Sequence, residues 1–343
     1  MRKLWLHSVR AYIKLGLFFY FKKIQIHNTG NIPKDQPVLF LSNHQNALLD
    51  ALLIATKCGR FVHFLTRASV FKKSIADSLL RSLQMLPVYR IRDGWNNLSK
   101  NNPVFSTCAE LLQKKEGVVI FPEGSHNLRR TVRPLSKGFT RIIFETLEKY
   151  PDINLQLVPV GLNFVNAEEF EDSVSVFFGE PISAKAFVTD FSNDNVINLK
   201  EIIHDKISEL TTHIPTESYE ETITYLEDIN ANFLDPVIVN SCVKSGLKNC
   251  KVKELKNPDR IKPFLRFILK ILLFGPYLIW KGYVKPKIDE VEFISTFRFV
   301  VAITLVPFWI IAIGILLWSL VSLTVGICFV VAVIFLDLWI LKL

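Results

Sequence analysis

One stretch near the end of the sequence restricts the fold more than any other, because residues 299–336 contain no charged side chain. A spanning helix needs about 20 apolar residues, so this run and the few residues after it accommodate two membrane passes. We expect helices at 299–317 and 322–341, joined by a tight turn. A buried core helix is the competing interpretation, and the length of the uncharged run argues against it. The sequence therefore predicts a transmembrane hairpin.

Basic residues flank this predicted hairpin, with Arg298 before it and Lys342 after it. The positive-inside rule places both of its ends, and the domain that precedes it, on the cytoplasmic side. We therefore predict an integral membrane protein whose main domain faces the cytoplasm. Residues 263–284 are also apolar but carry basic side chains, among them Arg266 and Lys270. This segment is expected either to lie in the membrane interface or to span at a tilt.

The N-terminal residues 1–30 are rich in aromatic side chains, and basic residues interrupt the apolar run. No small-residue cleavage site follows, which argues against a signal peptide. This pattern favours an amphipathic helix lying in the membrane interface, with an ordinary packing helix as an equal alternative. The formal net charge of +9 favours acidic partners such as an anionic lipid surface. No nucleic-acid-binding motif accompanies that charge, so nucleic acid is not an expected partner.

Between these ends, residues 31–215 alternate short apolar runs with longer amphipathic ones. Runs such as PVLFLS, GVVIF and LQLVPVG predict buried strands, whereas NALLDALLIATK and KGFTRIIFETLEK have helical spacing. The alternation predicts an α/β domain with a largely parallel sheet flanked by helices. Residues 216–262 are polar with moderate helical patterning, and we expect a helical linker there.

The cysteines are scattered and odd in number, and no CxxC pair or Cys/His cluster occurs among them. This arrangement supports neither a disulfide framework nor a zinc site, so reduced thiols are expected throughout. The five are Cys58, Cys108, Cys242, Cys250 and Cys328.

The stretch LSNHQNALLD places His44 six positions before Asp50, directly after a strand-like run. On one ideal helix these side chains would point about 120° apart, because each residue turns ~100°. They can meet only if His44 lies in the strand-to-helix turn and Asp50 in the helix that follows. An imidazole oriented by a carboxylate can act as a general base. The plainer alternative is that the pair caps the first turn of a helix.

Three further segments add candidate polar residues, two of them where predicted strands end. In GVVIFPEGSHNLRR, Glu123 and Gly124 follow a buried strand, which is where α/β proteins bind ligands. In LPVYRIRDG, Arg90 and Arg92 follow another strand, and guanidinium groups bind phosphate well. In RPLSKGF, Lys137 stands just before a predicted helix. Each also has a plain interpretation, as a surface ion pair, a solvated turn residue or a helix-start charge.

Together, NHQNALLD, LPVYR, FPEGS and LVPVGL resemble, in this order, the four motif blocks of the glycerolipid acyltransferase family. The resemblance covers residues 32–182 and includes VFFGEPI, which is similar to the family's closing segment. The His-to-Asp spacing is one residue longer than the family's usual one. HQNALLD and FPEGSHN are instead similar to HANQFVD and FPEGGSH, the motifs of the subgroup that acylates glycerol-3-phosphate or dihydroxyacetone phosphate.

This resemblance implies an O-acyltransferase of phospholipid biosynthesis that uses acyl-CoA or acyl carrier protein as donor and needs no other cofactor or metal. His44 would remove the proton from an acceptor hydroxyl, with Asp50 holding its imidazole. Lysophosphatidic acid or another lysophospholipid is the alternative acceptor. A non-catalytic lipid-binding membrane protein is the alternative of another class. The sequence does not indicate an oligomeric state.

The resemblance also implies which residues bind the acceptor. Arg90 would bind its phosphate, and Glu123 and Gly124 would belong to its pocket. No GxSxG elbow is present, so Ser125 beside His126 is not expected to be a nucleophile. The remaining candidates for substrate contacts are Ser125, Arg92, Arg129 and Lys137.

Overall fold

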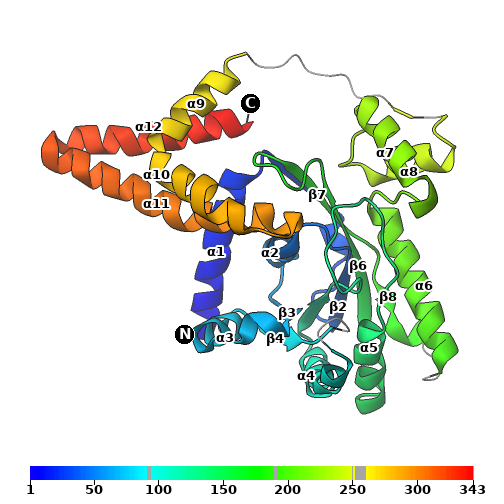
Figure 1. The fold of residues 1–343 in the computed structure, drawn as a ribbon. Helices are drawn as coiled ribbons and strands as arrows, with labels where there is room; N and C mark the ends of the chain where they lie inside the picture. Colours follow the sequence, from blue (N-terminus) through cyan, green and yellow to red (C-terminus); the bar gives the residue numbers. More distant parts are fainter. Residues whose placement is uncertain (91–93, 188–191, 249, 252–259, 343) are drawn as a thin grey trace.

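An eight-stranded sheet lies at the centre of the protein, with helices on both of its faces (Figure 1). The computed structural model describes residues 1–90, 94–187, 192–248, 250–251 and 260–342. The strand order is β1-β7-β6-β2-β5-β3-β4, and β8 pairs with β6 beside this path. The strands are β1 (Lys23–His27), β2 (Val38–Ser42), β3 (Val62–Arg67), β4 (Met85–Val88), β5 (Gly117–Ile120), β6 (Gln156–Phe164), β7 (Ser173–Phe178) and β8 (Ile182–Ser183).

The sheet is mostly parallel, as the sequence predicted, because five of its seven strand pairings are parallel. The exceptions are the pairings of β6 with β7 and with β8. Strand β2 is buried along its whole length between β5 and β6. Because the carboxyl ends of adjacent parallel strands meet at one edge, the loops after β2 and β5 come together there.

Two apolar clusters fill the faces of the sheet. Helix α1 (Arg2–Tyr20) and helix α2 (Ala47–Lys57) cover one face. The other face is covered by α4 (Asn102–Gln113), α5 (Gly138–Lys149) and α6 (Asn193–Leu210). The end of α6 reaches β6 closely, because a Cβ at Gly161 would overlap the carbonyl of Leu210.

The expected N-terminal helix over residues 1–30 is too long. Helix α1 ends at Tyr20, and Lys23–His27 forms the edge strand β1. KIQIH alternates polar and β-branched residues, which fits a strand, and it pairs in parallel with β7. The domain therefore begins at this strand.

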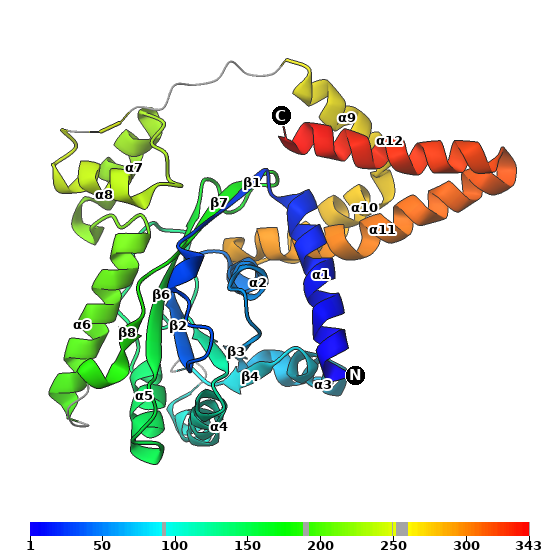
Figure 2. The ribbon, with the colours of Figure 1, turned by 180° about the vertical axis from the view of Figure 1, so that it is seen from behind.

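The C-terminal helices form the predicted hairpin, which projects from the domain in Figures 1 and 2. Helix α11 (Ile294–Leu320) packs along α12 (Leu323–Lys342), and a Cβ at Gly314 or Gly326 would press on the facing helix. Both helices are long and apolar enough to cross a membrane. The preceding segment is not one straight helix. Helix α9 (Lys262–Leu272) is followed, after a bend of 96°, by the segment Phe274–Lys287, which begins with α10 (Phe274–Leu278).

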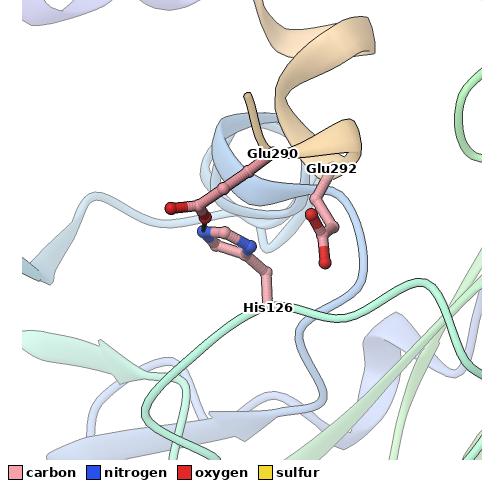
Figure 3. A group of neighbouring side chains, drawn as sticks. All are labelled: His126, Glu290 and Glu292. Carbon is pink, nitrogen blue, oxygen red and sulfur yellow. Dashed lines mark ion pairs between the residues drawn. The ribbon is translucent and has the colours of Figure 1, made fainter. Parts of the chain in front are cut away.

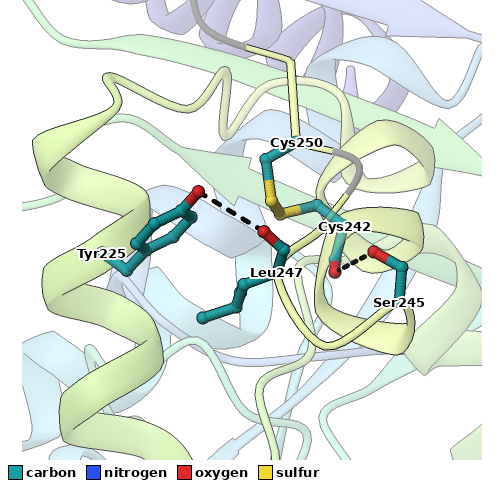
Figure 4. The surroundings of a disulfide bond; sticks show 5 residues. All are labelled: Tyr225, Cys242, Ser245, Leu247 and Cys250. Atoms are coloured by element: carbon teal, nitrogen blue, oxygen red, sulfur yellow. Dashed lines mark hydrogen bonds between the residues drawn. A yellow bond between two sulfur atoms is a disulfide. The ribbon is translucent and has the colours of Figure 1, made fainter.

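The residues predicted as a linker form a small packed unit instead of an extended segment. Helix α7 (Tyr219–Asp228) and helix α8 (Pro236–Lys244) enclose an apolar cluster with Phe233 between them. The prediction that all cysteines are reduced is wrong here, because Cys242 and Cys250 form a disulfide (Figure 4). The chain after α8 turns back at Gly246, which has φ +65°, and this turn brings the two Cα atoms to 4.7 Å.

Candidate active site

His44 lies in the turn between β2 and α2, and its side chain meets Asp50 across that turn. The distance from His44 Nδ1 to Asp50 Oδ2 is 2.7 Å. The same Asp50 oxygen accepts the backbone N–H of Asn46 at 2.8 Å, so the carboxylate also closes the turn. The Asp50 side chain is fully buried, whereas that of His44 is 16% exposed. Since an ionised carboxylate only accepts hydrogen bonds, the imidazole proton lies on Nδ1 and leaves Nε2 as an acceptor.

Two asparagines and one phenylalanine fix this turn in place. The Asn43 side chain donates to the carbonyl of Leu162 at 2.9 Å and accepts that residue's N–H at 2.8 Å, which joins the turn to β6. The Asn46 side chain donates to the carbonyl of Ala167 at 2.8 Å. The His44 ring stacks on Phe121, with centroids 4.0 Å apart. The imidazole is therefore held on both its edge and its face.

The FPEGS segment after β5 bonds directly to the His44 turn. The His44 backbone N–H donates to Glu123 Oε1 at 3.2 Å. The other carboxylate oxygen, Oε2, accepts from Arg133 Nε at 2.6 Å. Burial raises the pKa of Glu123, while the Arg133 guanidinium opposes that shift. Glu123, predicted as a pocket residue, thus has both oxygens engaged within the protein, where it connects two loops.

Gly124 and Ser125 follow in the same loop. Gly124 has φ +73°, a backbone conformation that favours glycine, and there is open space where a Cβ would stand. Ser125 binds Arg133 through both its hydroxyl and its carbonyl oxygen. Arg90 follows β4 and its Nη1 lies 3.5 Å from the carbonyl of Gly124, which brings a cation to the edge of this loop.

The remaining predicted site residues fall in different places. The Ser136 N–H donates to the carbonyl of Pro122, so the exposed Lys137 stands next to the FPEGS loop at the start of α5. Arg129 points away from the loop, where it pairs with Glu220 on α7. Arg92 lies outside the described residues.

Several residues of the site were not singled out in the sequence. Arg133 is one of three arginines in the basic stretch 129–133, and it is the one that forms an ion pair with Glu123. Its neighbour Arg130 instead lies over the ring of Phe233, between α7 and α8, and donates to the carbonyls of Phe164 and Val165. Burial lowers the pKa of Arg130 to about 10. The first turn of α11 also reaches the site, because Thr296 Oγ1 accepts the N–H of Leu48 at 3.2 Å.

His126 lies beside the dyad, with its ring centroid 5.6 Å from that of His44. The segment leading into α11 places Glu290 and Glu292 against it (Figure 3). His126 Nε2 is 3.6 Å from Glu290, and ligand atoms of all three residues lie within 4.8 Å of one another. Nitrogen and oxygen donors of this kind suit a divalent cation, a possibility absent from the sequence predictions. The contact between His126 and Glu290 also holds this segment against the site.

A large cavity lies elsewhere in the described residues. It has a volume of about 750 Å³ and opens between α1, α9, α10, α11 and α12. Its walls are mostly apolar, with Arg298 and Glu169 among the charged groups that line it. None of its lining residues belongs to the His44 turn or to the FPEGS loop.

Comparison with known proteins identifies the domain. Residues 23–163 match the family described as Acyltransferase. A protein of Saccharomyces cerevisiae named glycerol-3-phosphate O-acyltransferase 1 is 28% identical over 134 residues, or 38% of this chain and 18% of its own length. The chain thus spans less than a fifth of that relative.

Two further proteins match a larger part of the chain. A 1-acyl-sn-glycerol-3-phosphate acyltransferase of Borreliella burgdorferi is 23% identical over 205 residues, covering 58% of this chain and 76% of its own length. The crystal structure of a 1-acyl-sn-glycerophosphate acyltransferase from Thermotoga maritima covers 61% of this chain and 80% of its own, with 19% identity and a TM-score of 0.45.

Proposed function

Because the chain belongs to the glycerolipid acyltransferase family through its domain at residues 23–163, we propose that it acylates a small glycerol phosphate at a membrane. The acceptor is glycerol-3-phosphate or dihydroxyacetone phosphate, and the donor is an acyl thioester of CoA or acyl carrier protein. The observation that supports this most directly is the 2.7 Å contact between His44 and the buried Asp50.

The proposed reaction begins with the acceptor hydroxyl at His44 Nε2. Since Nδ1–H is committed to Asp50, Nε2 accepts the hydroxyl proton, and the carboxylate stabilises the imidazolium that forms. The acceptor oxygen attacks the thioester carbonyl carbon to give a tetrahedral intermediate. The C–S bond then breaks, and the leaving thiolate takes the proton back from His44. The products are an ester and a free thiol, and the protein forms no covalent intermediate.

The other residues prepare this geometry or bind the acceptor. Arg90 at the edge of the FPEGS loop is the proposed phosphate-binding group, with Lys137 a second cation on the same side. Glu123 is a positioning residue, because it holds the His44 backbone rather than presenting a free carboxylate. The open space beside Gly124 leaves room for the acceptor.

A second acceptor deserves a parallel test, because a lysophosphatidate also presents a hydroxyl near a phosphate. The relative from Borreliella burgdorferi, which is named for that substrate, aligns with more of this chain than the yeast relative does. The proposed orientation keeps the domain at the cytoplasmic membrane surface, with α11 and α12 in the bilayer.

The test uses detergent-solubilised protein, labelled acyl-CoA and acyl carrier protein, and a panel of the two small phosphates and lysophosphatidate. We expect transfer to the small phosphates, abolished in His44→Ala while expression and membrane insertion are retained. Transfer only to lysophosphatidate would keep the mechanism and replace the acceptor. Turnover by His44→Ala at the wild-type rate would refute the role of the His44–Asp50 pair. If the wild-type protein transfers no acyl group with any combination of donor and acceptor, a non-catalytic lipid-binding protein would be favoured.

A further inference from the structure

The short segment after β3 exposes large apolar side chains to solvent. It contains η2 (Ala68–Phe71) and helix α3 (Ser74–Ser82). The exposed fractions are 44% for Val70, 84% for Ile75 and 48% for Leu79. We call these three residues the α3 apolar patch.

The α3 apolar patch continues into the N-terminal helix. Ile75, Leu79 and Ser82 follow one another at helical spacing, so they form one stripe along α3. The Trp5 indole N–H donates to Ser82 Oγ at 3.2 Å, which joins the end of this stripe to α1. Figures 1 and 2 both show α3 at the N-terminal end of α1. Beyond Trp5, α1 exposes Leu4 on its own surface.

The direction of the hairpin indicates what covers this surface. In both views α1 runs across the base of the hairpin formed by α11 and α12, on the side of the sheet away from α6, α7 and α8. A helix that crosses the base of a membrane hairpin lies along the bilayer surface. The face of α1 that carries Leu4 continues at helical spacing to two exposed residues beside the hairpin, Leu15 and Phe18. Leu15 lines the cavity between α1 and the C-terminal helices, and Lys342 at the end of α12 lies over the Phe18 ring. The α3 apolar patch therefore faces the same bilayer plane.

The charges around the patch fit a lipid surface. Lys72 and Lys73 are exposed between Val70 and Ile75, and residues 67–82 contain four basic side chains against one acidic. Such basic residues beside an apolar patch are attracted by anionic headgroups. We propose that the η2–α3 segment inserts the α3 apolar patch into the interface of an anionic bilayer, as a second contact distant from the hairpin. The domain then rests on the membrane along α1 and α3.

The experiment reports the environment of Ile75 directly. A Cys328→Ser parent removes the exposed free cysteine, whereas Cys58 and Cys108 are buried. An environment-sensitive fluorophore is attached to Ile75→Cys in the full-length protein, reconstituted in nanodiscs that contain anionic phosphatidylglycerol. Phe308→Cys on the exposed side of α11 serves as the lipid reference, and Val237→Cys, an exposed position of α8, serves as the water reference.

We expect the probe at position 75 to shift to shorter wavelength and lose intensity to nitroxide-labelled lipid, as at position 308 and unlike position 237. Emission at position 75 that matches the water reference would overturn the proposal, and would point to a protein partner instead. In a second variant, Lys72→Glu combined with Lys73→Glu should weaken the shift in anionic discs. If the two lysine substitutions leave the emission shift at position 75 unchanged, insertion of the patch does not depend on anionic lipid and this part of the proposal fails. Acyl transfer plays no part in either readout.

Discussion

Replacing Arg133 by methionine removes the cation that holds Glu123 in the site. The Glu123 side chain is only 3% exposed, and its Oε2 lies 2.6 Å from Arg133 Nε. Removing one partner of a buried ion pair costs about 3–5 kcal/mol, because the other charge stays buried without its counterion. Since the Arg133 side chain is 27% exposed and water relieves part of that loss, we expect the lower end, about 3 kcal/mol.

The assay is thermal unfolding in detergent, for which 1 kcal/mol corresponds to about 2–4 °C in a domain of this size. Arg133→Met should therefore lower Tm by roughly 6–12 °C. Arg129→Met is the matched control on the same stretch, because its partner Glu220 is 85% exposed. We expect it to cost about 1 kcal/mol or less, even with its contact to the Tyr219 ring included.

A double-mutant cycle with Glu123→Gln separates the ion pair from the bonds that Arg133 makes to Ser125. The double variant should be more stable, by about 2 kcal/mol, than the sum of the single costs predicts. Because Arg133 lowers the pKa of Glu123, its loss should also move the acidic limb of the activity profile to higher pH. Additive costs within about 0.5 kcal/mol, together with an unmoved acidic limb, would refute the coupling.

Two further changes test the phosphate site and a buried carboxylate. Arg90→Ala should raise the KM for the acceptor by about 10- to 100-fold, because a hydrogen bond to a charged group is worth roughly 1.5–3 kcal/mol. The KM for the acyl donor should stay nearly unchanged. Equal effects on both substrates would exclude Arg90 from the phosphate-binding role. Asp172 has its pKa raised from 3.8 to about 6, chiefly by burial, although Asn166 and Ser173 donate to it. A raised pKa stabilises the fold below pH 4, and that contribution, about 3 kcal/mol, disappears as the pH rises through 6. Asp172→Asn should remove this pH dependence in Tm measurements between pH 4.5 and 7, and an unchanged slope would contradict the assignment.

The parts of the structure that the sequence predicted are those set by neighbouring residues. The strand-like VLFLS before His44 and the helical spacing after it required a turn there, and only that turn lets His44 reach Asp50. The length of the uncharged tail similarly required the hairpin. In both cases the physical constraint acts within about 40 residues of chain.

What could not be predicted depends on contacts between distant segments. Arg129, Arg130 and Arg133 stand in one basic stretch, and contacts with distant residues turn the first two away from Glu123. Arg129 pairs with Glu220 on α7, and Arg130 lies over the Phe233 ring. The disulfide depends on the backbone reversal after α8, which a spacing of eight residues between cysteines does not specify. Strand β1 is recognisable by its alternation, but its partner β7 lies about 150 residues away. The contact of α11 with the His44 turn has no sequence signal.

We expect that last contact to make the geometry of the His44–Asp50 pair sensitive to membrane thickness. Thr296 accepts a hydrogen bond from Leu48 in the first turn of α2, and Ser295 donates to the carbonyl of Ala167, which also accepts from Asn46. Helices longer or shorter than the surrounding hydrocarbon layer relieve the mismatch by tilting. A tilt of α11 would pull on both bonds at once, and through them on the turn that orients His44. If the protein acylates glycerol phosphates as proposed, the chains that it transfers would determine, through the thickness of the bilayer they form, how well His44 is aligned.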